Sequence, residues 1–121
     1  MPAKSLVPLY DSAMAHIQQH FMDEQLNRIT IAAALNCSTR QLSRAFEGRP
    51  MTLNAAIQLM RLYKGRELLR RKRNLPVAQI ATMVRFRNAK HFSTLFKKHF
   101  GRTPSEERKA VILRRKKVDV L

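Results

Sequence analysis

Hydrophobic residues recur every three or four positions over most of this chain, which is the spacing that places them on one face of an α-helix. Near the N-terminus, four of them follow at four-residue steps, namely Leu9, Ala13, Ile17 and Phe21. The chain has no alternating run long enough to form a sheet. The pattern therefore predicts an all-α fold, whose first helix begins near Ser5 and serves packing.

Residues 75–103 predict two short amphipathic helices, Val77–Val84 and Ala89–His99, joined by a tight connection at 85–88. In the second helix the bulky apolar residues share one stripe. Polar and cationic residues lie on the other side, namely Lys90, Ser93, Thr94 and Lys97. This arrangement indicates a helix-turn-helix motif that presents its second helix to the DNA major groove.

The same pattern occurs earlier in the chain. Residues 31–37 align with residues 80–86 at an offset of 49, and residues 42–46 align with residues 92–96 at an offset of 50. The extra residue lies in the second turn. We therefore expect two copies of one DNA-reading motif.

In the first copy, Asn27 is an N-cap for a helix that ends near Leu35, and Ser38 is an N-cap for a helix from Thr39 to about Glu47. The outer face of that second helix carries Thr39, Arg40, Ser43 and Arg44. An exposed arginine is often only a solvated surface residue. An arginine fork also matches guanine or two phosphate oxygens, and the counterparts in the second copy lie at the same helical phase, which favours DNA contact.

Between the copies, Thr52 caps a helix predicted over Leu53–Lys72. Its inner face is expected to comprise Ala56, Leu59, Met60, Leu62, Tyr63 and Leu69, and its outer face Arg61, Arg66, Arg70, Arg71 and Lys72. About twenty residues span roughly 30 Å. Because successive major grooves on one side of a duplex lie about 34 Å apart, such a connector could hold two reading helices one turn apart.

A cap-Pro-x-Glu sequence at Thr103–Glu106 predicts a short closing helix. The basic tail after it is either a contact for phosphates or an acidic partner, or a solvated end. The predicted organisation is an N-terminal helix plus first helix-turn-helix over 1–51, a connector over 52–73, a second helix-turn-helix with closing helix over 74–108, and the tail over 109–121.

The charge balance narrows the choice of partner. The chain has 24 Lys and Arg against 8 Asp and Glu, a net charge of +16. A polyanion is the expected partner, with nucleic acid first and an anionic membrane surface second. No apolar run is long enough to span a membrane, and the N-terminus lacks a signal-peptide pattern, so we expect a soluble intracellular protein.

Other chemistry is weakly represented. His16 and His20 have a spacing that can hold a metal, but no third ligand is near, so we expect two partly exposed histidines. The single Cys37 excludes an internal disulfide and is expected to be a small buried hydrophobe, since its counterpart is Phe86. With no Gly-rich phosphate loop, paired carboxylates or catalytic triad, we predict no enzyme activity, no metal and no cofactor.

The chain resembles the AraC/XylS family of bacterial transcription regulators from about Leu9 to Arg108. The matching pieces are Ile31-Ala32, Ser38-x-x-x-Leu42-x-Arg44-x-Phe46, Arg61-Leu62, Leu68-Leu69, Val77-x-x-Ile80-Ala81, Phe86, Phe92-x-x-x-Phe96-Lys97-Lys98-x-Phe100-Gly101 and Thr103-Pro104. The resemblance implies seven helices in two subdomains, whose recognition helices enter adjacent major grooves. Its base-reading positions match Arg40, Ser43 and Arg44, then Ala89, Lys90, Ser93 and Thr94.

Several positions depart from the family pattern, among them Thr94, where an arginine is common, and Lys90, where a small polar residue is common. Arg85 replaces the usual turn glycine, which predicts either a strained φ or a different turn type. Gly65 takes an alanine place inside the connector at a cost of roughly 1 kcal/mol. Glu107 occupies a place that is usually aromatic. Ala89 has no hydrogen-bonding side chain, so the second reader is expected mainly to bind phosphates or touch a thymine methyl group.

Together these features predict a sequence-specific double-stranded DNA-binding transcription regulator. The resemblance further implies activation by contact with RNA polymerase and a location in the bacterial cytoplasm, associated with the nucleoid. This chain is expected to bind as a monomer, whereas a longer parent could dimerise. The alternative is a basic module for RNA, anionic lipid or an acidic protein. RNA is disfavoured because the chain has no tryptophan and its phenylalanines follow the core phase.

Overall fold

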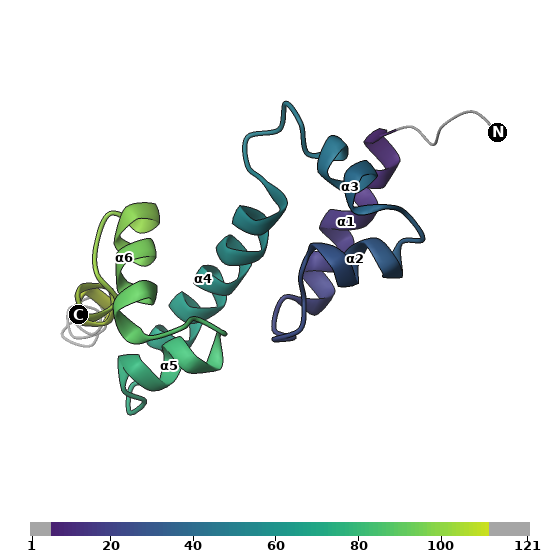
Figure 1. The fold of residues 1–121 in the computed structure, drawn as a ribbon. Coiled ribbons are helices and arrows are strands. Elements are labelled where there is room, and N and C mark those ends of the chain that lie inside the picture. The colour runs from purple at the N-terminus through teal and green to yellow at the C-terminus, as the bar shows by residue number, and fades with distance from the viewer. Residues whose placement is uncertain (1–5, 112–121) are drawn as a thin grey trace. The chain divides into compact units, whose positions relative to one another are not determined.

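The computed structural model describes residues 6–111. These residues contain no strand, which confirms the predicted all-α fold. The labelled helices in Figure 1 are α1 (Leu6–His20), α2 (Arg28–Ala34), α3 (Thr39–Ala45), α4 (Leu53–Arg71), α5 (Val77–Met83) and α6 (Ala89–Phe100). A closing helix occupies residues 104–111, so the described part has seven helices as predicted.

The helices begin at the predicted N-caps because side chains there satisfy free backbone N–H groups. Asn27 accepts a hydrogen bond from the Thr30 amide at 3.0 Å, and Ser38 accepts one from the Gln41 amide at 3.0 Å. In both caps the third helical residue returns a bond to the cap amide, which completes a capping box. Thr52 caps α4 by accepting from the Ala55 amide at 3.1 Å, without a reciprocal bond.

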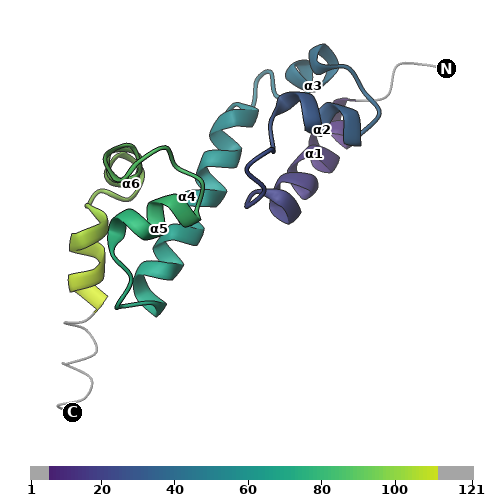
Figure 2. The same cartoon turned by 60° about the horizontal axis from the view of Figure 1, so that its bottom comes forward.

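The chain forms two compact units, Met1–Met60 and Arg61–Leu121, and α4 contributes to both. In the first unit α1, α2 and α3 lie side by side (Figures 1 and 2). Ala13 and Ile17 of α1 are fully buried, as the four-residue spacing predicted. The core also includes Ile57 of α4, which the predicted inner face of that helix did not include.

The core of the second unit contains a row of phenylalanine rings beside buried aliphatic residues such as Leu69 and Ile80. Phe92 and Phe96 are fully buried, with centroids 5.5 Å apart, and the rings of Phe86 and Phe100 extend the row at 5.2 and 4.6 Å. Gly65 of α4 lies against it, because a Cβ at this position would come within 2.7 Å of the Phe92 ring. Gly65 therefore weakens the helix but leaves space for the Phe92 ring.

One part of the predicted α4 pattern is wrong. Tyr63 does not belong to the inner face, since 48% of its surface is exposed. Arg66 and Arg70 lie outside the apolar inner face, but both are half-buried rather than fully exposed. Both lie against Glu107 of the closing helix, a contact between residues far apart in the chain that helical periodicity does not report. Cys37 is half-buried at the edge of the first core, not fully buried like its counterpart Phe86.

Candidate nucleic-acid interface

The two helix-turn-helix motifs have the same turn. After α2, the Cys37 amide donates to the Ala32 carbonyl at 3.0 Å and the Asn36 amide donates to the Ala33 carbonyl at 3.2 Å. After α5, the equivalent pair of bonds runs to Ala81 at 2.9 Å and to Thr82 at 3.1 Å. Both are Schellman motifs, which end a helix by satisfying its last carbonyls. The internal repeat seen in the sequence is thus a repeat of backbone geometry.

Each turn needs one residue in the left-handed region. Asn36 has φ 55° and Arg85 has φ 68°. Asparagine enters this region readily, whereas for other L-residues it costs roughly 1–2 kcal/mol. Of the two outcomes predicted for Arg85 in place of a turn glycine, the strained φ is therefore confirmed.

Helix α3 presents a fully open polar face. Its apolar residues Leu42 and Ala45 are buried in the first core. All four residues predicted to contact DNA from this helix are exposed, namely Thr39, Arg40, Ser43 and Arg44. Two guanidinium groups and two hydroxyls therefore share one surface, and this set can donate to base edges and to phosphate oxygens.

Helix α6 presents a more restricted face. Lys90, Thr94 and Lys97 are exposed, whereas Ala89 and Ser93 are half-buried. The Thr94 hydroxyl donates to the Lys90 carbonyl of its own helix at 2.9 Å. Asn88 caps the helix by accepting from the His91 amide at 2.8 Å, a role that the sequence reasoning did not assign to it. On α6, the freely available groups are mainly lysine ammonium groups.

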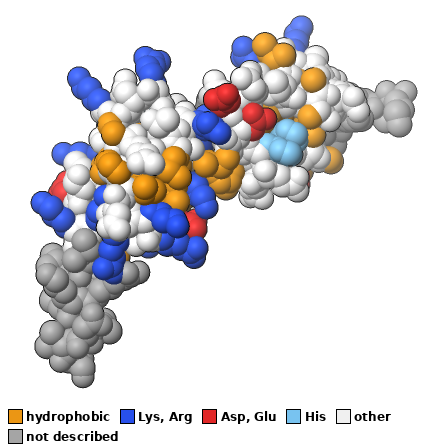
Figure 3. Space-filling view, turned by 90° about the horizontal axis from the view of Figure 1, so that it is seen from below, with side chains coloured by type: hydrophobic (Ala, Val, Ile, Leu, Met, Phe, Trp, Pro, Cys, Tyr) orange, Lys and Arg blue, Asp and Glu red, His pale blue; other side chains and the backbone are white. Residues whose placement is uncertain are grey.

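The charge is divided unequally between the two units. Residues 1–60 contain five Lys and Arg against four Asp and Glu, whereas residues 61–121 contain nineteen against four. On the face drawn in Figure 3, Lys and Arg side chains gather over the second unit. The attraction for a polyanion therefore originates mostly from the second unit.

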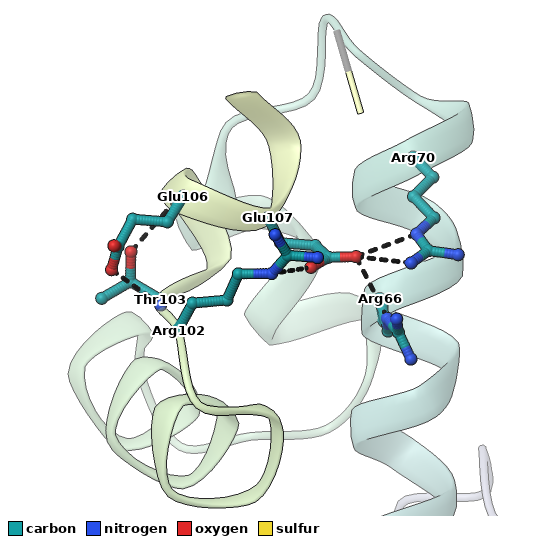
Figure 4. Close-up of polar contacts among 6 residues, drawn as sticks. All are labelled: Arg66, Arg70, Arg102, Thr103, Glu106 and Glu107. Atoms are coloured by element: carbon teal, nitrogen blue, oxygen red, sulfur yellow. Dashed lines mark hydrogen bonds and ion pairs between the residues drawn. The ribbon is translucent and has the colours of Figure 1, made fainter. Parts of the chain in front are cut away.

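A buried carboxylate in the second unit holds three arginines, and the sequence reasoning missed this group (Figure 4). Oε1 of Glu107 accepts from Arg66 Nε at 3.1 Å and from Arg70 at 2.9 Å (Nε) and 2.7 Å (Nη2), and Oε2 forms an ion pair with Arg102 Nε at 2.5 Å. Burial raises the pKa of Glu107, but the hydrogen bonds from Arg70 and Arg66 and the charge of Arg102 outweigh burial and lower that pKa. The only sequence signal was an acid in a place that is usually aromatic.

The closing helix carries two further contacts that fix it in place. At its start, Thr103 and Glu106 form the predicted capping box, with bonds of 3.0 and 3.1 Å. Arg108 donates to the Leu69 and Lys72 carbonyls at the end of α4, at 3.3 and 3.1 Å. The closing helix and α4 are therefore joined both at Glu107 and at the α4 terminus.

The rings of His16 and His20 are in contact, with centroids 4.4 Å apart and ring planes tilted by 35°. Burial and the charge of His20 lower the pKa of His16. Residues 6–111 contain no group of three His, Cys, Asp or Glu side chains that could bind a metal ion. Nor does any helix in that range combine the length and apolar character needed to cross a membrane.

Comparisons with known proteins agree on one class of domain. A family model described as a helix-turn-helix domain matches residues 31–110. The transcriptional activator NphR of Rhodococcus sp is 33% identical over 93 residues, covering 77% of this chain and 28% of that protein. The HTH-type transcriptional activator RhaS of Escherichia coli O1:K1 is 33% identical over 96 residues, covering 78% of this chain and 34% of that protein. The chain thus spans about a third or less of the length of these relatives.

Two solved structures match this chain over most of their length. The C-terminal domain of AraT, a response regulator from Geobacillus stearothermophilus, has a TM-score of 0.74 and 31% identity, covering 88% of both chains. A transcriptional regulator from Chromobacterium violaceum, described as an AraC-type DNA-binding domain-containing protein, has a TM-score of 0.76 and 29% identity, covering 84% of this chain and 90% of that one.

Proposed function

This chain belongs to the AraC/XylS family of helix-turn-helix proteins, and on that premise we propose that it is a sequence-specific, double-stranded DNA-binding transcription regulator. The observation that carries the proposal is the repeated motif. Two helices, α3 and α6, each follow a Schellman turn of the same geometry and each expose polar and cationic side chains. A helix with such a face fits the major groove of B-form DNA.

In the first unit, Arg40 and Arg44 are the principal readers. Their guanidinium groups can bind guanine O6 and N7 as a fork, or bridge phosphate oxygens. Thr39 and Ser43 lie on the same exposed surface and contribute hydroxyl contacts. We assign most of the sequence preference to this helix.

In the second unit, Lys90 and Lys97 contact backbone phosphates, which positions the protein without distinguishing bases. Ser93 and Thr94 face the base edges, and Ala89 touches a thymine methyl group. Because this set has fewer base-specific donors than α3, the second unit contributes mainly affinity.

The proposed complex is a monomer spanning two adjacent major grooves. Helix α4 has 19 residues and is therefore about 28 Å long, close to the roughly 34 Å between successive major grooves on one side of the duplex. The relatives NphR and RhaS are named transcriptional activators. We extend that role to this chain, with RNA polymerase as the protein partner.

The direct test is to select bound sequences from a random duplex pool. Fluorescence anisotropy then compares the selected duplex with a scrambled one over a salt series. If the complex neutralises six to ten phosphates, affinity falls by roughly 10³ to 10⁵ between 50 and 200 mM salt. Equal affinity for both duplexes at every salt concentration would show that the chain is only a nonspecific basic binder.

Single-stranded RNA and anionic lipid are the competing partners. Proteins that bind single strands usually stack bases on exposed aromatic rings. All six phenylalanines lie in the described part of the chain, and none of them is exposed. We therefore expect the selected duplex to displace both single-stranded RNA and anionic vesicles in competition, and the reverse order would favour the alternative.

A further inference from the structure

One face of α4 in the second unit combines arginines with an exposed aromatic ring. Tyr63, Arg66, Arg70 and Arg71 follow at positions i, i+3, i+7 and i+8, and together with Glu67 they line a shallow depression. Arg102 joins Arg66 and Arg70 on Glu107. We call Tyr63, Arg66, Arg70, Arg71 and Arg102 the arginine surface.

The buried Glu107 carboxylate fixes three of these arginines without covering them. Its contacts use Nε of Arg66 and of Arg102, and Nε and Nη2 of Arg70. The three side chains remain 31%, 34% and 37% exposed, respectively. Within the described residues, the other guanidinium N–H groups are thus held ready for a second acceptor. Such preorganisation lowers the entropy cost of binding.

The charges of the arginine surface are not balanced. Three guanidinium groups share the single Glu107 carboxylate, and Arg71 shares Glu67 with Lys64, at 3.4 and 3.5 Å. A positive surplus therefore remains at a site of low mobility. Carboxylates match it in charge and, through bidentate pairing with arginine, in geometry.

Tyr63 adds an apolar element. It is 48% exposed, and its ring packs edge-on against His99 and Phe100, with centroids 5.8 and 5.3 Å away. Tyrosine and arginine are among the residue types enriched in the hot spots of protein interfaces. The surface thus fits a segment that offers apolar side chains between its acids.

The arginine surface lies beside the C-terminal end of α6, whereas a recognition helix inserts its N-terminal end into the groove. Arg66 stacks on the Phe100 ring at 4.9 Å, and Phe100 is the last residue of α6. Recognition helices contact base edges with their N-terminal residues. The twelve residues of α6 extend over roughly 17 Å, so the arginine surface stays clear of the groove in the proposed complex.

We propose that the arginine surface docks an acidic segment of a partner protein, one that carries apolar residues among its carboxylates, while α6 contacts DNA. This inference rests on the proposed function only in one respect, namely that the acidic segment docks while the protein is bound to DNA. Docking itself requires only the second unit.

The test uses a short fluorescein-labelled peptide of glutamates interspersed with leucines, and the same peptide with serines in place of the leucines. Binding is measured by anisotropy to the full chain, both free and saturated with duplex DNA. Tyr63→Ala and Arg71→Glu remove exposed groups that do not touch Glu107. Lys98→Glu is the matched control, because it makes the same charge change at an exposed α6 position outside the arginine surface.

Each of the two surface variants should weaken binding of the leucine peptide to the DNA complex by roughly five- to thirtyfold. Lys98→Glu should leave it nearly unchanged, and the serine peptide should bind more weakly than the leucine peptide. Duplex affinity should respond to Arg71→Glu no more than to Lys98→Glu. Unchanged thermal unfolding of each variant shows that the effect is local.

Equal losses of peptide binding with Arg71→Glu and Lys98→Glu would overturn the proposal in favour of general attraction to a cationic protein. A larger loss of duplex affinity with Arg71→Glu, without loss of peptide binding, would make the surface a DNA contact instead. A chain that binds no duplex would refute the proposed function. The peptide measurements on the free chain would still decide docking.

Discussion

The two helix-turn-helix units share a backbone but differ in charge and in the chemistry of their exposed faces. Their turns match bond for bond, yet the first unit has a net charge of +1 and the second +15. The first exposes two arginines and two hydroxyls on its second helix, whereas the second exposes chiefly lysines. The same fold can therefore serve base reading in one unit and phosphate affinity in the other.

The largest expected change in stability comes from removing the Glu107 carboxylate, because only the second unit has a buried carboxylate shared by three arginines in the described part of the chain. Glu107→Ala leaves three arginines without their carboxylate and should lower the free energy of unfolding by roughly 2–4 kcal/mol, after allowance for their partial exposure. Urea unfolding measures the loss. Glu106→Ala removes an exposed cap partner, serves as the control and should cost clearly less than Glu107→Ala. Comparable losses in both variants would contradict a special role for Glu107.

The same carboxylate gives the protein an acid dependence. Because the pKa of Glu107 is lowered in the folded state, its contribution is fully present at neutral pH. It is lost as the pH falls from the ordinary glutamate pKa through the lower pKa of the folded protein. Glu107→Gln should flatten the acid limb of the stability curve, measured by urea unfolding at several pH values. If the acid side of the stability curve is unchanged, groups other than Glu107 cause the loss of stability at low pH.

Substitutions on α3 and α6 test whether the two helices contribute differently to DNA binding. Arg40→Ala and Arg44→Ala should each cost about 1–3 kcal/mol on a selected duplex and reduce the preference over a scrambled one. Lys90→Ala and Lys97→Ala should weaken both duplexes alike, and each should lower the salt slope by about one. Anisotropy titrations over a salt series measure all four variants. A uniform response to all four would remove the proposed division of labour.

Gly65→Ala tests the close packing of the second core. Alanine favours the helix by roughly 1 kcal/mol, but its Cβ would lie 2.7 Å from the Phe92 ring. Overpacking of a core costs about 1–3 kcal/mol, so we expect a net loss of roughly 1 kcal/mol in urea unfolding. The double variant Gly65→Ala/Phe92→Leu should cost less than the sum of its single changes, and strict additivity would argue against the clash.

The smallest expected effect concerns the two turns. Arg85→Gly should stabilise the protein by about 0.5–1 kcal/mol, because glycine adopts the left-handed region without a steric cost. Asn36→Gly should change stability by only a few tenths of a kcal/mol, since asparagine already tolerates this region. Thermal unfolding compares the two variants. Equal gains would mean that residue type at the turn does not distinguish the units.

Local sequence signals predicted most of the fold. Caps at Asn27, Ser38 and Thr52 and the apolar spacing gave the helix limits to within two residues, and the missing turn glycine gave the strained φ of Arg85. The features that were not predicted depend on contacts between side chains that are distant in the sequence. Glu107 meets Arg66 across 41 positions, and no periodicity encodes such a pairing.

The exposure of Tyr63 escaped prediction for a related reason. Its helical phase was close to that of the inner residues of α4, but Phe100 occupies the space beside it and holds its ring at the surface. For the recognition helices, the sequence located the polar faces. It did not show that α6 is more restricted than α3, since the Thr94 bond to Lys90 depends on a rotamer.

That bond restricts what Thr94 can recognise. A hydroxyl has one proton, and in α6 this proton is donated to the Lys90 carbonyl. Thr94 can therefore only accept from a base, and the acceptable partners in the major groove are the exocyclic amines of adenine and cytosine. In the proposed complex, the base facing Thr94 should be adenine or cytosine, so a single intrahelical bond excludes guanine and thymine at one position of the binding site.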